Sequence, residues 1–302
     1  MNNRNDRLGR FYGFLGVLGF SLTLPATRVA VADLDPMVVG FGRGVVAALL
    51  AAAALWGTNQ KRPSRKEIGP LLIVAGGVVL GFPLLSSWAM RHVPASHGAI
   101  VVAILPLATA VAATLRAGER PSPGFWAAGA MGGMTVVLFS AYEGLGRPQI
   151  ADLALLGAVV AAALGYAEGG FLARRIGGWQ VISWALVLAA PLLTVPLIFA
   201  LLRHGWSAPP VGWISFGYLS VVSQFVAFFA WYKGMALGGI SRVGQIQLFQ
   251  PFLTIFFSSL FLGETITPAA AVAALLVVGA VALGRKMPVG QTPPEGPRAA
   301  ER

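Results

Sequence analysis

The sequence contains no cysteine, and only three histidines and eleven carboxylates among its 302 residues. Without cysteine the chain has no disulfide bonds, no thiolate metal ligands and no cysteine nucleophile. It also lacks the H-E-x-x-H, G-x-S-x-G and Walker A patterns that mark zinc hydrolases, serine hydrolases and nucleotide-binding loops. These absences argue against an enzyme, a metal centre or a cofactor, and ATP-driven transport would need a separate subunit.

Charged residues are also scarce, at 11% of the chain, whereas 56% of the residues are hydrophobic and the mean hydropathy is +0.74. A soluble domain has about 25% charged residues because its surface must be solvated. The net charge of +11 does not indicate nucleic-acid binding, because most basic residues lie in short connections and no aromatic residues are interleaved with them. The composition therefore predicts a protein whose partner is the lipid bilayer, and no nucleic-acid partner.

Hydrophobic segments follow one another along the chain, each close to the length of about 20 residues that a membrane-spanning helix needs. Their length and the lack of strict alternation favour helices over barrel strands, and the short connections make neighbouring helices antiparallel. The first segment is too long for a secretory signal and is predicted to stay as the first helix. Ten spans are predicted, near residues 11–32, 37–56, 68–90, 95–115, 123–141, 150–172, 179–202, 209–234, 240–261 and 267–284.

Lys and Arg are distributed unequally between the two sets of connections. One set, which includes both ends of the chain, holds seventeen of them, whereas the other holds only Arg91, Arg147 and Arg203. Because basic residues accumulate in cytoplasmic connections, both termini are predicted to be cytoplasmic, in the plasma membrane that is the inner membrane of a bacterium. Residues 1–10 are then a cytoplasmic segment, and residues 287–302 are a disordered cytoplasmic tail.

The second half of the sequence repeats the first at an offset of 145 residues. Pro106 matches Pro251 at this offset, and Gly118-Glu119 matches Gly263-Glu264. Residues 11–141 and 150–286 are therefore predicted to be two five-helix repeats, and the odd number of helices inverts the second copy. This all-α 5+5 inverted plan is typical of secondary transporters. Glu119 and Glu264 would lie on opposite membrane faces, where each is expected to cap or line its turn.

Ten helices in this arrangement, with Pro106 and Pro251 inside the fourth and ninth helices and a Gly-Glu turn after each, resemble the drug/metabolite transporter superfamily. Within it the chain is similar to the EamA-type permeases. Its length and the stretch Arg91–His97 resemble the YddG-type amino-acid exporters. The resemblance implies a secondary transporter that exports small metabolites, above all amino acids, by alternating access. The fourth helix has no aromatic residue, which favours a broad or aliphatic range over strictly aromatic substrates.

Other substrates and mechanisms are also compatible with the sequence. Exported metabolites of another kind, amphipathic drugs, or a passive channel built on the same inverted repeat are the alternatives. The choice between a monomer and a homodimer stays open. Only Glu168 and His97 offer a titratable group inside a span, so facilitated diffusion or exchange is favoured over proton coupling. Glu168 lies shortly before Arg174, and a structural ion pair is expected there.

Polar side chains inside a span are costly, so each needs a partner or a function. The guanidinium of Arg43 suits either a substrate carboxylate or a snorkelling position at the membrane surface. The glutamine side chains can bind both the ammonium and the carboxylate of a zwitterion, or they can form hydrogen bonds between helices. His97 is expected at the outer end of its span, in a structural or a binding role. The candidates for the substrate path are Arg43, Phe82, Trp88, His97, Tyr166, Gln224, Gln247 and Gln250, and Pro106 and Pro251 are the predicted kinks.

Overall fold

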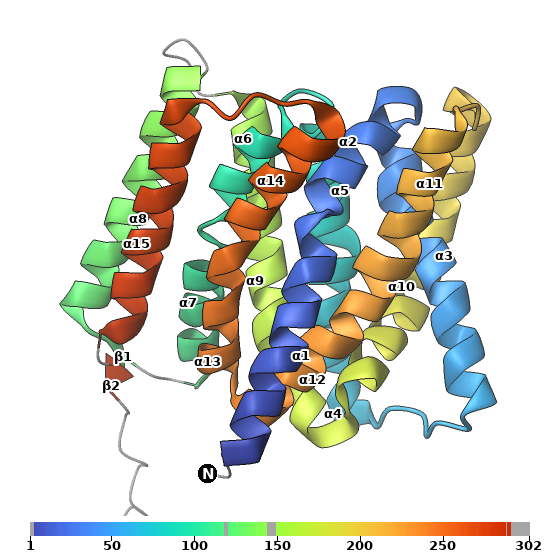
Figure 1. The fold of residues 1–302 in the computed structure, drawn as a ribbon. Helices are drawn as coiled ribbons and strands as arrows, with labels where there is room; N and C mark the ends of the chain where they lie inside the picture. The colour runs from blue at the N-terminus through green and yellow to red at the C-terminus, as the bar shows by residue number, and fades with distance from the viewer. Residues whose placement is uncertain (1–2, 118–119, 144–148, 288, 291–302) are drawn as a thin grey trace, which may run out of the picture.

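The computed structural model describes residues 3–117, 120–143, 149–287 and 289–290. These residues form a bundle of helices that run roughly along one direction (Figure 1). The described part has only one strand pair, in which β1 (Arg120–Pro121) lies antiparallel to β2 (Val289–Gly290). Glu119 and nearly all of the predicted tail lie outside the described residues.

The first half of the chain supplies nine helical segments. They are α1 (Asn3–Ser21), α2 (Thr23–Asp33), α3 (Pro36–Gly57), α4 (Arg65–Val74), the π-helix η1 (Ala75–Gly81), α5 (Phe82–Ala89), α6 (Ala95–Val102), α7 (Leu105–Ala117) and α8 (Pro123–Glu143). The second half continues with α9 (Ile150–Ile176), α10 (Gly178–His204), α11 (Pro210–Tyr218), the π-helix η2 (Leu219–Val226), α12 (Ala227–Gly238), α13 (Ile240–Gly244), the 3₁₀-helix η3 (Gln245–Phe249), α14 (Gln250–Leu262) and α15 (Pro268–Lys286).

Seven helical stretches of the described chain are long and apolar enough to cross a membrane. They are Arg7–Asp33, Pro36–Gly57, Arg65–Met90, Ala95–Arg116, Ile150–Ile176, Gly178–His204 and Pro210–Gly238. Shorter apolar helices cover Pro123–Phe139, Ile246–Leu262 and Pro268–Gly284, where the remaining predicted spans lie. The expected helical, polytopic membrane protein is confirmed, whereas the number of spans and their orientation stay predictions.

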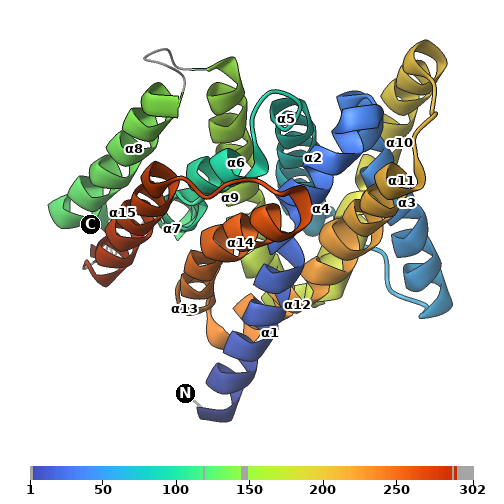
Figure 2. The ribbon, with the colours of Figure 1, turned by 45° about the horizontal axis from the view of Figure 1, so that its top comes forward.

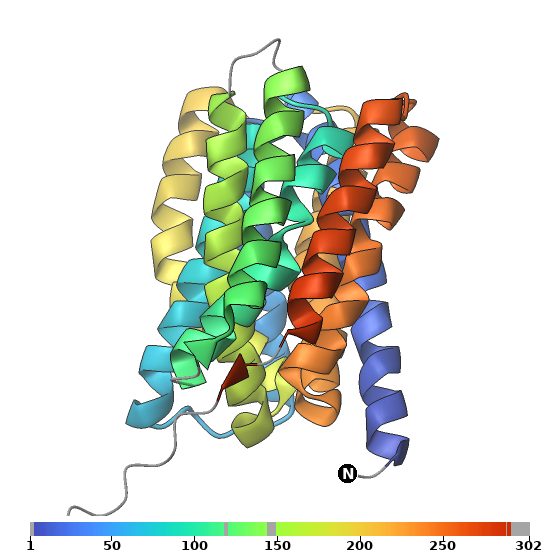
Figure 3. The same cartoon turned by 90° about the vertical axis from the view of Figure 1, so that its left-hand side faces the viewer.

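The two halves of the chain are interleaved in the bundle. Helix α1 packs along α12 and contacts α14, α3 packs along α10, and α5 and α7 pack on α9 (Figure 2). The contact between α1 and α12 depends on glycine, because a Cβ atom on Gly234 would lie 2.7 Å from the backbone nitrogen of Gly13. Helices α8 and α15 pair at one edge of the bundle (Figure 3).

Both halves contain a broken helix at the position of the repeated proline. The first break is the turn at Ala103 and Ile104 between α6 and α7, and the second is η3 between α13 and α14. Pro106 and Pro251 each stand second in the helix after the break, where a missing N–H leaves no hydrogen bond unmade. The break in each half thus directly precedes the matched proline, and a kink at Pro106 and Pro251 stays a prediction.

Candidate functional site

A pocket near the centre of the bundle is lined by side chains from both halves of the chain. The free cavity between them has a volume of about 20 Å³. In this conformation the pocket is thus narrow. Its lining residues are Phe20, Thr23, Leu24, Arg43, Val78, Phe82, Leu105, Ala162, Tyr166, Ser223, Gln224, Phe228 and Gln250.

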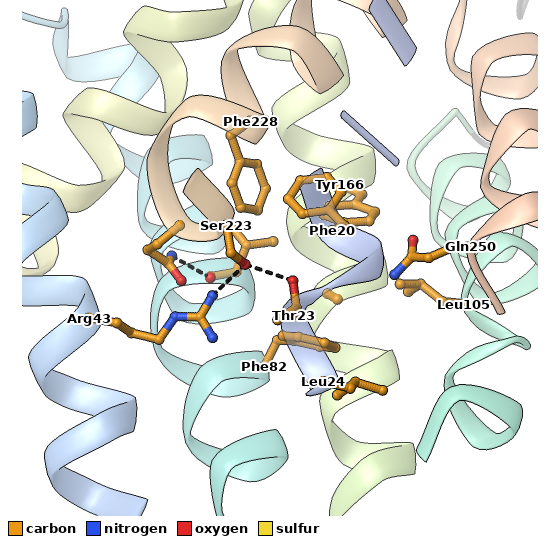
Figure 4. Close-up of a pocket in the computed structure, with 13 residues that line it drawn as sticks. Phe20, Thr23, Leu24, Arg43, Phe82, Leu105, Tyr166, Ser223, Phe228 and Gln250 are labelled. Carbon is orange, nitrogen blue, oxygen red and sulfur yellow. Dashed lines mark hydrogen bonds between the residues drawn. The ribbon is translucent and has the colours of Figure 1, made fainter. Parts of the chain in front are cut away.

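Arg43, about a third of the way along α3, brings a positive charge into this pocket. Its side chain is 2% exposed, and Nη2 donates a hydrogen bond of 2.8 Å to Ser223 Oγ (Figure 4). Ser223 Oγ is also 2.8 Å from Thr23 Oγ1. The Nε and Nη1 atoms of Arg43 are buried without a partner, and no described residue that lines the pocket is acidic. The guanidinium therefore keeps free donors where a carboxylate or another anion can accept them.

Two π-helices meet at the pocket and explain the position of Gln224. η1 lies in the first half and η2 at the matching place in the second half, and both widen the helix where the pocket forms. Gln224 Nε2, in η2, donates a hydrogen bond of 2.9 Å to the carbonyl oxygen of Val78 in η1. Gln224 thus binds one half of the chain to the other as well as lining the pocket.

Aromatic rings form an apolar wall beside the guanidinium. The ring centroids of Phe20 and Phe228 are 4.9 Å apart, and Tyr166 lies 6.0 Å from each of them. In Figure 4 these three rings lie on one side of Arg43, and Phe82 lies on another. The pocket therefore offers a charged end and a body that suits apolar groups.

Gln250 lies at the end of the pocket away from Arg43 (Figure 4). Its Oε1 atom is buried without a hydrogen-bond partner. Gln250 also lines a smaller cavity together with Gln247, Pro106 and Pro251. Gln247 and Gln250, both predicted to line the substrate path, thus lie at the break between α13 and α14.

Two predicted path residues lie away from the pocket. Trp88 is 39% exposed near the end of α5, and its ring lies 4.4 Å from that of His92. His97 is buried in the first turn of α6, where its Nε2 atom is 2.6 Å from Asp152 Oδ1 on α9. Asp152 lies in the first turn of α9, inside the predicted span 150–172, and its pair with His97 joins the two halves.

Glu264 caps the same helix α6 from the second half of the chain. Its Oε1 and Oε2 atoms accept hydrogen bonds of 2.8 Å each from the backbone N–H groups of Ala95 and Ser96. The capping role expected for Glu264 is confirmed, but the capped helix belongs to the other half and does not adjoin its own turn. Because a carboxylate at a helix N-terminus satisfies free N–H groups, this contact ties the loop after α14 to α6.

Glu168 forms an ion pair near the end of its span. Its Oε2 atom accepts a hydrogen bond of 2.9 Å from Nε of Arg116, the arginine at the end of α7. The expected structural ion pair is confirmed, and its partner lies on α7 because Glu168 is on the buried face of α9 whereas Arg174 is exposed. The Arg116 side chain is 59% exposed, so the pair lies at the edge of the bundle.

The sequence did not single out Thr23, Ser223, Phe20 or Phe228 as pocket residues. Small hydroxyl side chains and phenylalanines are common in apolar helices, where they usually bond their own backbone or face lipid. Nothing in the local pattern shows that Thr23 and Ser223, 200 residues apart, share one hydrogen bond. A signal existed only for Ser223, which directly precedes the polar residue Gln224 inside an apolar span.

Two curated relatives align with nearly the whole chain. An uncharacterized transporter of Bacillus subtilis (strain 168), YdeK, is 44% identical over 92% of this chain and 97% of its own length. A probable terminal-alkyne amino-acid exporter of Streptantibioticus cattleyicolor is 24% identical over 92% of this chain and 93% of its own. A chain in a solved crystal structure has the same fold, with a TM-score of 0.65 and 18% identity over 91% of this chain and 95% of that one.

The chain matches the EamA-like transporter family twice, at residues 7–141 and again at residues 149–284. Members of this family are transporters and not enzymes. The apolar helices and the bacterial relatives together place the protein in the inner membrane as a multi-pass transporter. The chain belongs to the EamA-like transporter family.

Proposed function

We propose that this transporter exports amino acids by alternating access, with the substrate carboxylate held by Arg43. The observation that carries the proposal is the buried guanidinium, which has two unpartnered nitrogen atoms in a pocket formed by both halves. A charged group in the middle of a membrane helix costs about 2.5–3.5 kcal/mol on the insertion scale, so it is retained where it has a task. Binding an anion is the task for which free donors on a guanidinium are suited.

The remaining pocket surface suits the rest of an α-amino acid. The Oε1 atom of Gln250 is an acceptor without a donor at the far end of the pocket, where a hydrogen-bond donor on the substrate's side chain can supply one. The faces of Phe20, Tyr166 and Phe228 attract a cation and also accept an apolar side chain. A relative named as a probable terminal-alkyne amino-acid exporter supports the same substrate class.

Alternating access is supported by how the pocket is closed. Its lining comes from both halves, and the free space inside is too small for an amino acid in this conformation. Substrate entry therefore requires the halves to move apart at one end. Glu264 and the His97–Asp152 pair fasten α6 to the second half at the end opposite the start of α1, which is the predicted outer face (Figure 1). The conformation is thus held closed on that side, and release of α6 would open it outward.

The test is uptake of radiolabelled amino acids into proteoliposomes that contain the purified protein, with and without a pH gradient. We expect saturable uptake, competition by unlabelled substrate, and faster uptake into vesicles preloaded with the same amino acid. A flux that does not saturate and shows no effect of preloading would indicate a channel. Folded protein that takes up no amino acid would overturn the substrate proposal, and other metabolites and amphipathic drugs would then be tested.

A further inference from the structure

A second cavity lies directly behind Gln250 and contains a buried amide with no partner. Both Nε2 and Oε1 of Gln247 lack a hydrogen bond, although the residue is only 2% exposed. The free cavity has a volume of about 10 Å³ in this conformation. Its lining residues are Leu24, Ala99, Val102, Ala103, Pro106, Gln247, Gln250, Pro251 and Thr254.

The surroundings of Gln247 leave its amide free for a ligand. Thr254 is the other hydrogen-bonding side chain deep in this lining, and its hydroxyl already donates to the carbonyl oxygen of Ser21 at 2.9 Å. The rest of the described lining, apart from Gln250, is apolar, and none of it is charged. A buried amide with neither its donor nor its acceptor paired is costly, so it persists where a ligand or a water completes it.

The position of this cavity connects it to the substrate pocket. Leu24 and Gln250 line both cavities, so the second one continues from the end of the pocket farthest from Arg43. It also lies between the two helix breaks, at the first turns of α7 and α14. Broken helices can change their angle at such a point, which lets the narrow cavity widen when the halves move.

We propose that this cavity is the side-chain subsite of the transporter, and that Gln247 recognises a neutral hydrogen-bonding group on the substrate side chain. The inference rests on the proposed function, because it assumes a carboxylate on Arg43 at the opposite end. An amide side chain pairs with both free atoms of Gln247, whereas an apolar side chain leaves both unpaired. The lack of a charged group in the described lining excludes preference for charged side chains. The preferred substrates are amide or hydroxyl amino acids.

The experiment compares glutamine with methionine, which have side chains of similar length but differ in hydrogen bonding. Uptake into proteoliposomes gives the ratio of their transport efficiencies for the wild-type protein and for Gln247→Met. We expect glutamine to be favoured about tenfold by the wild type, and the ratio to fall to about one in Gln247→Met. Gln180→Met is the matched control, because Gln180 lies in α10 and lines neither cavity.

Equal transport of the two amino acids by the wild type, or an unchanged ratio in Gln247→Met, would overturn the inference and leave the proposed function intact. That outcome would mean that Gln247 has a structural role and that a water molecule makes the hydrogen bonds of its amide. Lack of uptake of any amino acid by folded protein would overturn the proposed function and this inference with it. Thermal stabilisation of the wild type by each amino acid is a second readout if Gln247→Met fails to fold, and glutamine must stabilise more than methionine.

Discussion

Replacing Arg43 with methionine is expected to stabilise the folded protein while it abolishes transport. The guanidinium is buried, and of its three nitrogen atoms only Nη2 has a partner, Ser223 Oγ. Methionine has a similar length, carries no charge and adapts its shape to an irregular space. An unpaired charge inside the bundle lowers the stability of the protein, even where substrate binding requires that charge.

The magnitude follows from two opposing terms. Removing a charge from the middle of a membrane helix recovers about 2.5–3.5 kcal/mol. Removing the hydrogen bond from a charged donor to Ser223 loses about 1.5 kcal/mol. Ser223 Oγ is not left unpaired, because its contact with Thr23 Oγ1 at 2.8 Å remains. The net expectation is a gain of about 1–2 kcal/mol in the free energy of unfolding.

The assay combines SDS-induced unfolding of the purified protein with uptake into proteoliposomes. Arg43→Lys is the matched control, because it keeps the charge and should show no gain in stability. The reasoning is refuted if Arg43→Met loses 1 kcal/mol or more of stability, since Arg43 would then be a packing residue. Normal uptake by Arg43→Met would refute its role in substrate binding.

The contacts around α6 and α9 give three further expectations. Glu264→Gln should lower the free energy of unfolding by about 2 kcal/mol, measured as above, because it removes a charged acceptor from two N–H groups. Asp152→Asn should cost about 3 kcal/mol, because it breaks a buried pair, and adding His97→Gln should cost little more if the two residues act together in a double-mutant cycle. Glu168→Gln should retain most uptake, because the exposed arginine that it pairs with makes a weak ion pair, and complete loss in normally inserted protein would contradict this.

Much of the fold follows from the sequence because the bilayer imposes long apolar helices. The segment lengths identified the helices, and the matched prolines lie directly after the break in each half. The π-helices η1 and η2 could not be predicted, because a π-turn depends on packing across the bundle and not on the composition of one segment. Val78 of η1 and Gln224 of η2 both line the pocket.

The candidate site was predictable where a residue was anomalous by itself. Arg43, Gln247 and Gln250 are conspicuous in apolar spans, and the structure places all three at connected cavities. The burial of Asp152 was not predictable. The residue lies so close to the start of its predicted span that the sequence does not show whether its side chain is in water or on a buried face. Its partner His97 was visible in the sequence, but the pairing between two halves requires the tertiary fold.

Competition between an amino acid and its amide tests the central claim most directly. Uptake of the best radiolabelled amino acid into proteoliposomes is measured with an excess of the same unlabelled amino acid, or of its α-carboxamide, which lacks the carboxylate. The account predicts that the acid inhibits uptake and that the carboxamide inhibits at least tenfold less, because Arg43 recognises the negative charge. Equal inhibition by the two compounds would contradict the account, because the guanidinium of Arg43 would then not bind the substrate carboxylate.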